Sequence, residues 1–72
     1  MTGTVVSFDD RKGWGFICPT AGGPDNFVYQ TEILMEGRRT LHKGDRVEYG
    51  VEQGPKGRPV AVRVLVTKKA EA

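Results

Sequence analysis

The sequence predicts an all-β domain, a small closed or nearly closed barrel of five antiparallel strands. The chain has 72 residues, enough for one small hydrophobic core. No window long enough to count shows the periodicity of an amphipathic helix, whereas short runs rich in valine and aromatic residues alternate with glycine, proline and aspartate. Five short antiparallel strands in a chain of this length favour a barrel, because closure removes the exposed edges of an open sheet.

The expected strands share a high content of β-branched and aromatic residues and are bounded by turn signals. They cover residues 4–8, 14–18, 26–29, 46–52 and 60–66. Turn residues gather at 9–11, 19–25 and 54–57. The long polar connection from 30 to 43 is expected to contain a short helical turn near 31–34 and then an ordered loop.

The first aromatic strand lies within Lys12-Gly13-Trp14-Gly15-Phe16-Ile17, and the second is Asn26-Phe27-Val28-Tyr29. Side chains alternate between the two faces of a strand, so the large rings face one way and Ile17 and Val28 face the core. This pattern places aromatic rings on the outside, against their usual burial preference. Exposed rings can stack on unpaired nucleic-acid bases.

The last two strands also have distinct faces. In the fourth, Val47, Tyr49 and Val51 are expected on one face and Glu48 and Glu52 on the other. In the fifth, Val60, Val62, Val64 and Val66 are expected on one face with Arg63 opposite. Tyr49 alternates with valines and is therefore expected in the core.

The basic residues lie mainly on connections, although eleven lysines and arginines against nine acidic residues leave a net charge of only +2. The basic pairs are Arg11 with Lys12, Arg38 with Arg39, Lys56 with Arg58, and Lys68 with Lys69. Such placement suits a rim that follows phosphates, but it is equally typical of solvated loops.

Composition argues against several classes of function. One cysteine and one histidine, Cys18 and His42, supply neither an internal disulfide nor a zinc site. The sequence offers no nucleophile–base pair, paired carboxylates or phosphate-cradling loop, so we expect no enzyme and no cofactor. No basic segment precedes an apolar run at the N-terminus, and no stretch approaches the roughly 20 apolar residues of a membrane span. A cytoplasmic protein without membrane contact is expected.

The two aromatic motifs resemble the nucleic-acid-binding motifs of the cold-shock domain family. Domains of this family are small five-stranded OB-fold barrels. The resemblance extends along the chain through Gly3, Val5, Phe8, Thr31, Ile33, Glu36-Gly37, Thr40-Leu41, Gly44, Val47, Gly54 and Lys56-Gly57. It implies a cold-shock domain over residues 1–66 and a short tail over 67–72, with Arg58 as an extra residue before Pro59. RNA-recognition motif domains are disfavoured because they require two amphipathic helices.

The chain departs from the family pattern at several positions. Val6 and Ser7 occupy positions where the family commonly has a basic residue and a tryptophan. Tyr29 and Gln30 occupy positions where the family has histidine and phenylalanine. Arg38 replaces an aromatic residue of the family. With Phe8 at the margin, the expected nucleic-acid-binding residues are Phe8, Lys12, Trp14, Phe16, Phe27, Tyr29, Gln30, Arg38, Lys56 and Arg58. The guanidinium group of Arg38 and hydrogen bonds from Gln30 are expected to replace part of the missing stacking.

The resemblance implies a monomeric protein that binds single-stranded RNA and DNA and acts as an ATP-independent RNA chaperone or as a regulator of transcription or translation. Binding alone shifts the equilibrium toward unpaired strands. A second interpretation is a protein-interaction module in which the aromatic patch is the hot spot. Salt dependence of binding distinguishes the two.

Overall fold

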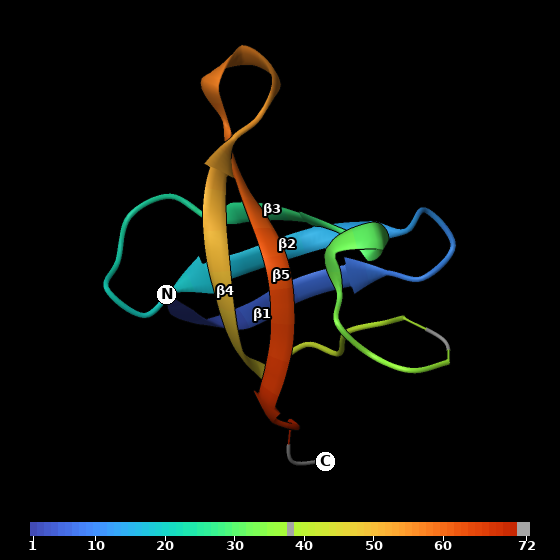
Figure 1. Cartoon of the computed structure of the whole chain (residues 1–72). Coiled ribbons are helices and arrows are strands. Elements are labelled where there is room, and N and C mark those ends of the chain that lie inside the picture. Colours follow the sequence, from blue (N-terminus) through green and yellow to red (C-terminus); the bar gives the residue numbers. More distant parts are fainter. Residues whose placement is uncertain (38, 71–72) are drawn as a thin grey trace.

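A computed structural model, which describes residues 1–37 and 39–70, shows a closed five-stranded barrel (Figure 1). The strands are β1 (Thr2–Asp9), β2 (Trp14–Pro19), β3 (Asn26–Tyr29), β4 (Arg46–Gln53) and β5 (Pro59–Lys68), and the 3-10 turns are η1 (Gln30–Glu32) and η2 (Pro55–Gly57). Around the barrel the strands follow the order β1-β2-β3-β5-β4, and β4 pairs with β1. In Figure 1, β4 and β5 cross steeply in front of β1, β2 and β3.

The predicted all-β barrel of five strands is confirmed, with antiparallel pairing everywhere except at one parallel seam. Phe27 pairs with Val60 and Val28 with Ala61, and β3 and β5 run in the same direction there. The pairs β1–β2, β2–β3, β4–β5 and β1–β4 are antiparallel. A closed ring of five strands cannot alternate in direction all the way round, because five is an odd number. One parallel seam is therefore required.

The core contains the residues that were expected to face inward from the two aromatic strands. Ile17 and Val28 are both 0% exposed, and Tyr49 is buried as predicted. The Tyr49 hydroxyl donates a hydrogen bond to Oδ1 of buried Asn26 over 2.8 Å. The other buried apolar residues are Val5, Ile33, Leu41, Val47, Ala61 and Val64.

Irregular pairing between β4 and β5 overturns the predicted single valine face of β5. Glu48 of β4 pairs with Leu65 of β5, and Gly50 pairs with Val62. Over this stretch β5 therefore contains one residue more than β4. Arg63 lies within this bulge with φ of 50°, a left-handed conformation. An extra residue reverses the alternation of side chains, so the fully buried residues of β5 are Ala61 and Val64.

Burial along β4 ends before Val51. Val47 and Tyr49 are buried as predicted, whereas Val51 is 39% exposed although it pairs with buried Ala61. The predicted half-buried pattern is therefore confirmed from Val47 to Tyr49 and does not extend to Val51. Another bulge lies in β1, where Val5 and Ser7 are paired with the adjacent residues Ile17 and Phe16, so Val6 is the extra residue. Within the described part of the chain, no helix has the length and apolar character needed to cross a bilayer.

Candidate nucleic-acid interface

The pairing of β2 with β3 brings the four expected rings together. Trp14 is opposite Tyr29, and Phe16 is opposite Phe27. Residues directly opposite in an antiparallel pair place their side chains on the same face of the sheet. The register therefore places the four rings on one face of the β2–β3 pair, away from Ile17 and Val28.

The rings pack mainly against one another. Trp14 stacks on Phe27 with ring centroids 5.1 Å apart and planes inclined by 21°. Phe16 meets Phe27 edge to face at 5.3 Å, and it meets Trp14 edge to face at 5.7 Å. Tyr29 lies 4.6 Å from Phe27 and is 44% exposed. We call these four residues the aromatic face. Mutual packing holds the rings in place, which reduces the conformational entropy lost when a ligand binds.

Gly15 separates Trp14 from Phe16 because the β1 backbone lies directly beneath it. A Cβ atom at this position would lie 2.2 Å from the carbonyl oxygen of Ser7. Gly15 is buried and paired with Phe8. This glycine therefore allows β1 and β2 to approach closely, while its two ring-bearing neighbours point outward.

The turn between β1 and β2 positions Lys12 beside the aromatic face. Oδ1 of Asp9 accepts hydrogen bonds from the backbone N–H groups of Arg11, at 2.9 Å, and Lys12, at 3.1 Å. Nζ of Lys12 lies 5.6 Å from the centroid of the Trp14 ring. The cation–π contact places a positive charge at the edge of the ring cluster.

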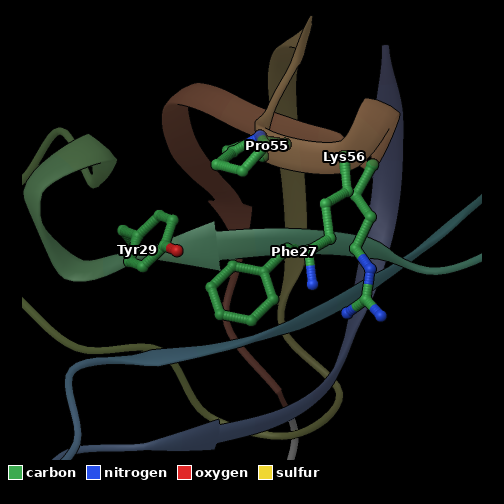
Figure 2. Close-up of a pocket in the computed structure, with 6 residues that line it drawn as sticks. Phe27, Tyr29, Pro55 and Lys56 are labelled. Atoms are coloured by element: carbon green, nitrogen blue, oxygen red, sulfur yellow. The ribbon is translucent and has the colours of Figure 1, made fainter.

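A pocket of about 240 Å³ lies beside the aromatic face on its β3 side, between β3 and η2 (Figure 2). It is lined by Phe27, Tyr29, Pro55, Lys56, Arg58 and Val60. Figure 2 shows the rings of Phe27 and Tyr29 on β3 with Pro55 across the pocket. Two basic side chains that were predicted only as rim residues, Lys56 and Arg58, thus lie beside two rings.

Sequence reasoning missed Pro55 and Val60 as pocket residues. Val60 reaches the pocket because it pairs with Phe27 across the parallel seam. The only local signal was the turn sequence around Pro55, which predicts a turn but does not predict what the turn packs against.

The remaining predicted residues are more peripheral. Phe8 is half-buried and packs against the core, consistent with a place at the margin. Gln30 is exposed, and its backbone N–H donates to the Gly13 carbonyl oxygen at 2.8 Å, close to Trp14 in sequence. Arg38 lies outside the residues that the structure describes.

Comparison with known proteins assigns the chain to a family. Residues 1–67 match the family described as the 'Cold-shock' DNA-binding domain. The chain belongs to the cold-shock domain family. This is a family of non-enzymatic, nucleic-acid-binding domains, and its OB-fold agrees with the five-stranded barrel described above.

Several relatives support the assignment. The chain is 48% identical over 68 residues to cold shock-like protein CspD of Escherichia coli K12, covering 94% of this chain and 92% of that protein. It is 52% identical over 56 residues to cold shock-like protein CspA of Stigmatella aurantiaca, covering 78% of this chain and 82% of that one. A solved structure, Drosophila Unr CSD456, is similar with a TM-score of 0.77 and 27% identity, covering 99% of this chain and 28% of that chain.

Proposed function

We propose that this protein binds single-stranded RNA and DNA by stacking unpaired bases on the aromatic face. The observation that carries the proposal is the cluster of four mutually packed outward rings, with Trp14 and Phe27 stacked at 5.1 Å. Base–aromatic stacking contributes about 1–3 kcal/mol per base and tolerates any base, because every base has a π-face. In a duplex those faces are covered by neighbouring bases, so a single strand is preferred.

Positive charge beside the aromatic face supports a path for the sugar-phosphate backbone. Lys12 lies at the edge of Trp14, and Lys56 and Arg58 line the pocket beside Tyr29. A single strand whose bases lie on the rings brings its phosphates past these cations. Gln30, whose backbone N–H donates to the Gly13 carbonyl oxygen in the first turn, is proposed to donate side-chain hydrogen bonds to a base edge.

Such binding needs no nucleotide hydrolysis to open weak RNA structure. A ligand that binds the unpaired state shifts the folding equilibrium of the RNA toward that state. We therefore propose that the protein acts in the cytoplasm as a monomeric RNA chaperone or as a regulator of transcription or translation. We propose residues 1–66 as the domain that carries this activity, and the last strand of its barrel, β5, continues to Lys68.

Titration of Trp14 fluorescence tests the proposal. We expect a single-stranded pyrimidine heptamer to quench the emission, and a duplex of the same sequence to leave it unchanged, since Trp14 is the one tryptophan in the chain. Binding of the duplex as tightly as the single strand would contradict base stacking. Insensitivity of binding to salt would favour a protein-interaction surface instead.

A further inference from the structure

A second hollow, separate from the pocket beside η2, lies on the β1 side of the aromatic face. It is an open groove lined by Val6, Ser7, Phe8, Asp9, Asp10, Arg11, Leu41, His42 and Lys43. One wall is the bulged part of β1, and the other is the segment 41–43. Because Val6 and Ser7 have short side chains and are both exposed, the space between the walls stays open.

The groove continues directly from the rings. Ser7 pairs with Phe16, and Asp9 pairs with Trp14, across the β1–β2 seam. Paired residues share a face, so Ser7 extends the row formed by Phe27 and Phe16. A strand that leaves the pocket containing Lys56 and crosses the rings therefore enters this groove.

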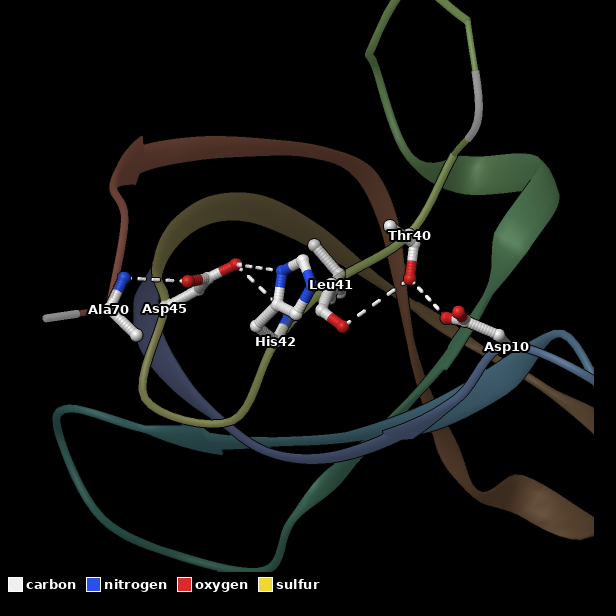
Figure 3. Close-up of polar contacts among 6 residues, drawn as sticks. All are labelled: Asp10, Thr40, Leu41, His42, Asp45 and Ala70. Carbon is white, nitrogen blue, oxygen red and sulfur yellow. Dashed lines mark hydrogen bonds and ion pairs between the residues drawn. The ribbon is translucent and has the colours of Figure 1, made fainter. Parts of the chain in front are cut away.

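The charged side chains of the groove are all exposed, and its two carboxylates accept hydrogen bonds from nearby groups. Arg11 and Lys43 are exposed, and the side chain of His42 is 77% exposed. Oδ1 of Asp9 accepts hydrogen bonds from the backbone N–H groups of Arg11 and Lys12. Asp10 accepts a hydrogen bond from the Thr40 hydroxyl, which ties the β1–β2 turn to the opposite wall (Figure 3).

Asp45 holds the segment that carries His42. Its carboxylate, 4% exposed, accepts the backbone N–H of His42 through Oδ2 at 3.0 Å and that of Ala70 through Oδ1 at 2.7 Å. Nδ1 of His42 lies 4.0 Å from the same Oδ2, as Figure 3 shows, so Nε2 lies on the side of the ring away from Asp45. Backbone bonds from Val5 N–H to the Asp45 carbonyl and from Gly44 N–H to the Val5 carbonyl attach this segment to β1.

We propose that this groove binds a phosphate of the single strand just beyond the aromatic face, through His42, Lys43 and the Ser7 hydroxyl. The inference rests on the proposed function and extends its site. Short side chains at Val6 and Ser7 provide no ring for a base. The groove offers N–H and O–H donors instead, and these suit phosphate oxygens.

Lys43 supplies the positive charge that a phosphate in this groove would meet. The groove holds two cations, Arg11 and Lys43, and two carboxylates, Asp9 and Asp10, and both carboxylates accept hydrogen bonds from nearby groups. Each added phosphate contact raises the salt slope by about 0.7, which corresponds to about fivefold in affinity at about 0.1 M salt.

The test compares the binding of an oligothymidine heptamer by wild-type, Lys43→Gln and Lys68→Gln proteins over a range of salt concentrations. Lys43→Gln is expected to bind about fivefold more weakly at about 0.1 M salt, with a salt slope smaller by about 0.7. Lys68→Gln removes an exposed cation of β5 that lies outside the groove, and it should keep the wild-type affinity and slope.

Two results would overturn the inference. A Lys43→Gln variant that keeps the wild-type affinity and salt slope, or a Lys68→Gln variant that loses as much slope as Lys43→Gln, means that the strand does not enter the groove. In both cases binding itself persists, so the aromatic face remains the site. If the heptamer does not bind at all, the proposed function fails together with this inference.

Discussion

At Phe27, contacts with Trp14, Phe16 and Tyr29 converge, and the side chain also lines the pocket beside η2. Phe27→Ala removes a stacking surface and loosens the other rings. We expect single-strand affinity to fall by about 1–3 kcal/mol, while the salt slope changes little because no cation is removed. Fluorescence titrations over a range of salt concentrations measure both quantities. A large loss of slope with unchanged affinity at high salt would contradict the assignment of Phe27 to stacking.

Lys12 and Lys56 are expected to contact phosphates, in contrast to the stacking role of Phe27. Neutralising both with Lys12→Gln and Lys56→Gln should weaken binding to every sequence about equally and lower the salt slope by about 1.4, at about 0.7 for each phosphate contact. The same titrations on oligonucleotides of different base composition measure this. If the double variant changed base preference and not slope, these lysines would contact bases, and the proposed rim would be wrong.

Tyr49 and Asn26 form a buried pair that supports the barrel. Tyr49→Phe leaves Oδ1 of Asn26 buried without its donor, which should lower the free energy of unfolding by about 1–3 kcal/mol in urea titrations. Affinity for single strands should not change, because Tyr49 lies in the core. Burial first, and the nearby Cys18 thiolate second, raise the pKa of Tyr49 above 10.0.

The raised pKa of Tyr49 makes the stability of the folded protein fall at high pH. In the unfolded chain the phenol ionises near its ordinary pKa of 10.0, whereas in the folded protein it stays protonated to higher pH. The stabilisation is therefore complete below pH 10 and is lost as pH rises through the folded pKa. Above pH 10, wild-type protein should lose stability more steeply than Tyr49→Phe. Parallel curves for the two proteins would show that this phenol stays solvated.

At the scale of the strands, sequence reasoning succeeded where the backbone is regular. Between β2 and β3 each residue has one partner, so alternation placed Trp14, Phe16 and Ile17 on the correct faces. In β5, the bulge at Arg63 reverses the alternation, and nothing in a run of Val-Arg-Val marks that residue as the one with positive φ. The pocket residues Pro55 and Val60 depend on closure of the barrel, which brings together segments that local patterns treat separately.

The bulge in β1 makes a testable contrast with the family pattern. Ser7 is exposed and paired with Phe16, so Ser7→Trp adds a ring beside the aromatic face without entering the core. We expect single-strand binding to tighten, by at most the roughly 1–3 kcal/mol of one full stack less what the Ser7 hydroxyl contributes to phosphate binding in the groove. The melting temperature should change little. Unchanged affinity on both RNA and DNA would place Ser7 away from the path of the strand.

Exposed apolar residues form two separate surfaces on the molecule, which differ in the charges around them. On one side lies the aromatic face, flanked by the pocket with Lys56 and Arg58 and by the groove with His42 and Lys43. Elsewhere, Met1, Leu34 and Leu65 line a different hollow together with Glu48 and Arg63 and are about half exposed. The first surface has more cations than carboxylates around its rings, and the second does not. Only the first suits a polyanion.

Mapping backbone amide chemical shifts during titration with an oligothymidine heptamer tests the central claim most directly. The account predicts that the largest shifts lie on β2 and β3 around Trp14, Phe16 and Phe27, with smaller shifts at Lys56 and His42. It predicts small shifts around Leu34 and Leu65. Largest shifts around Leu34 and Leu65, with the amides of Trp14 and Phe27 unmoved, would contradict binding of unpaired bases by the aromatic face.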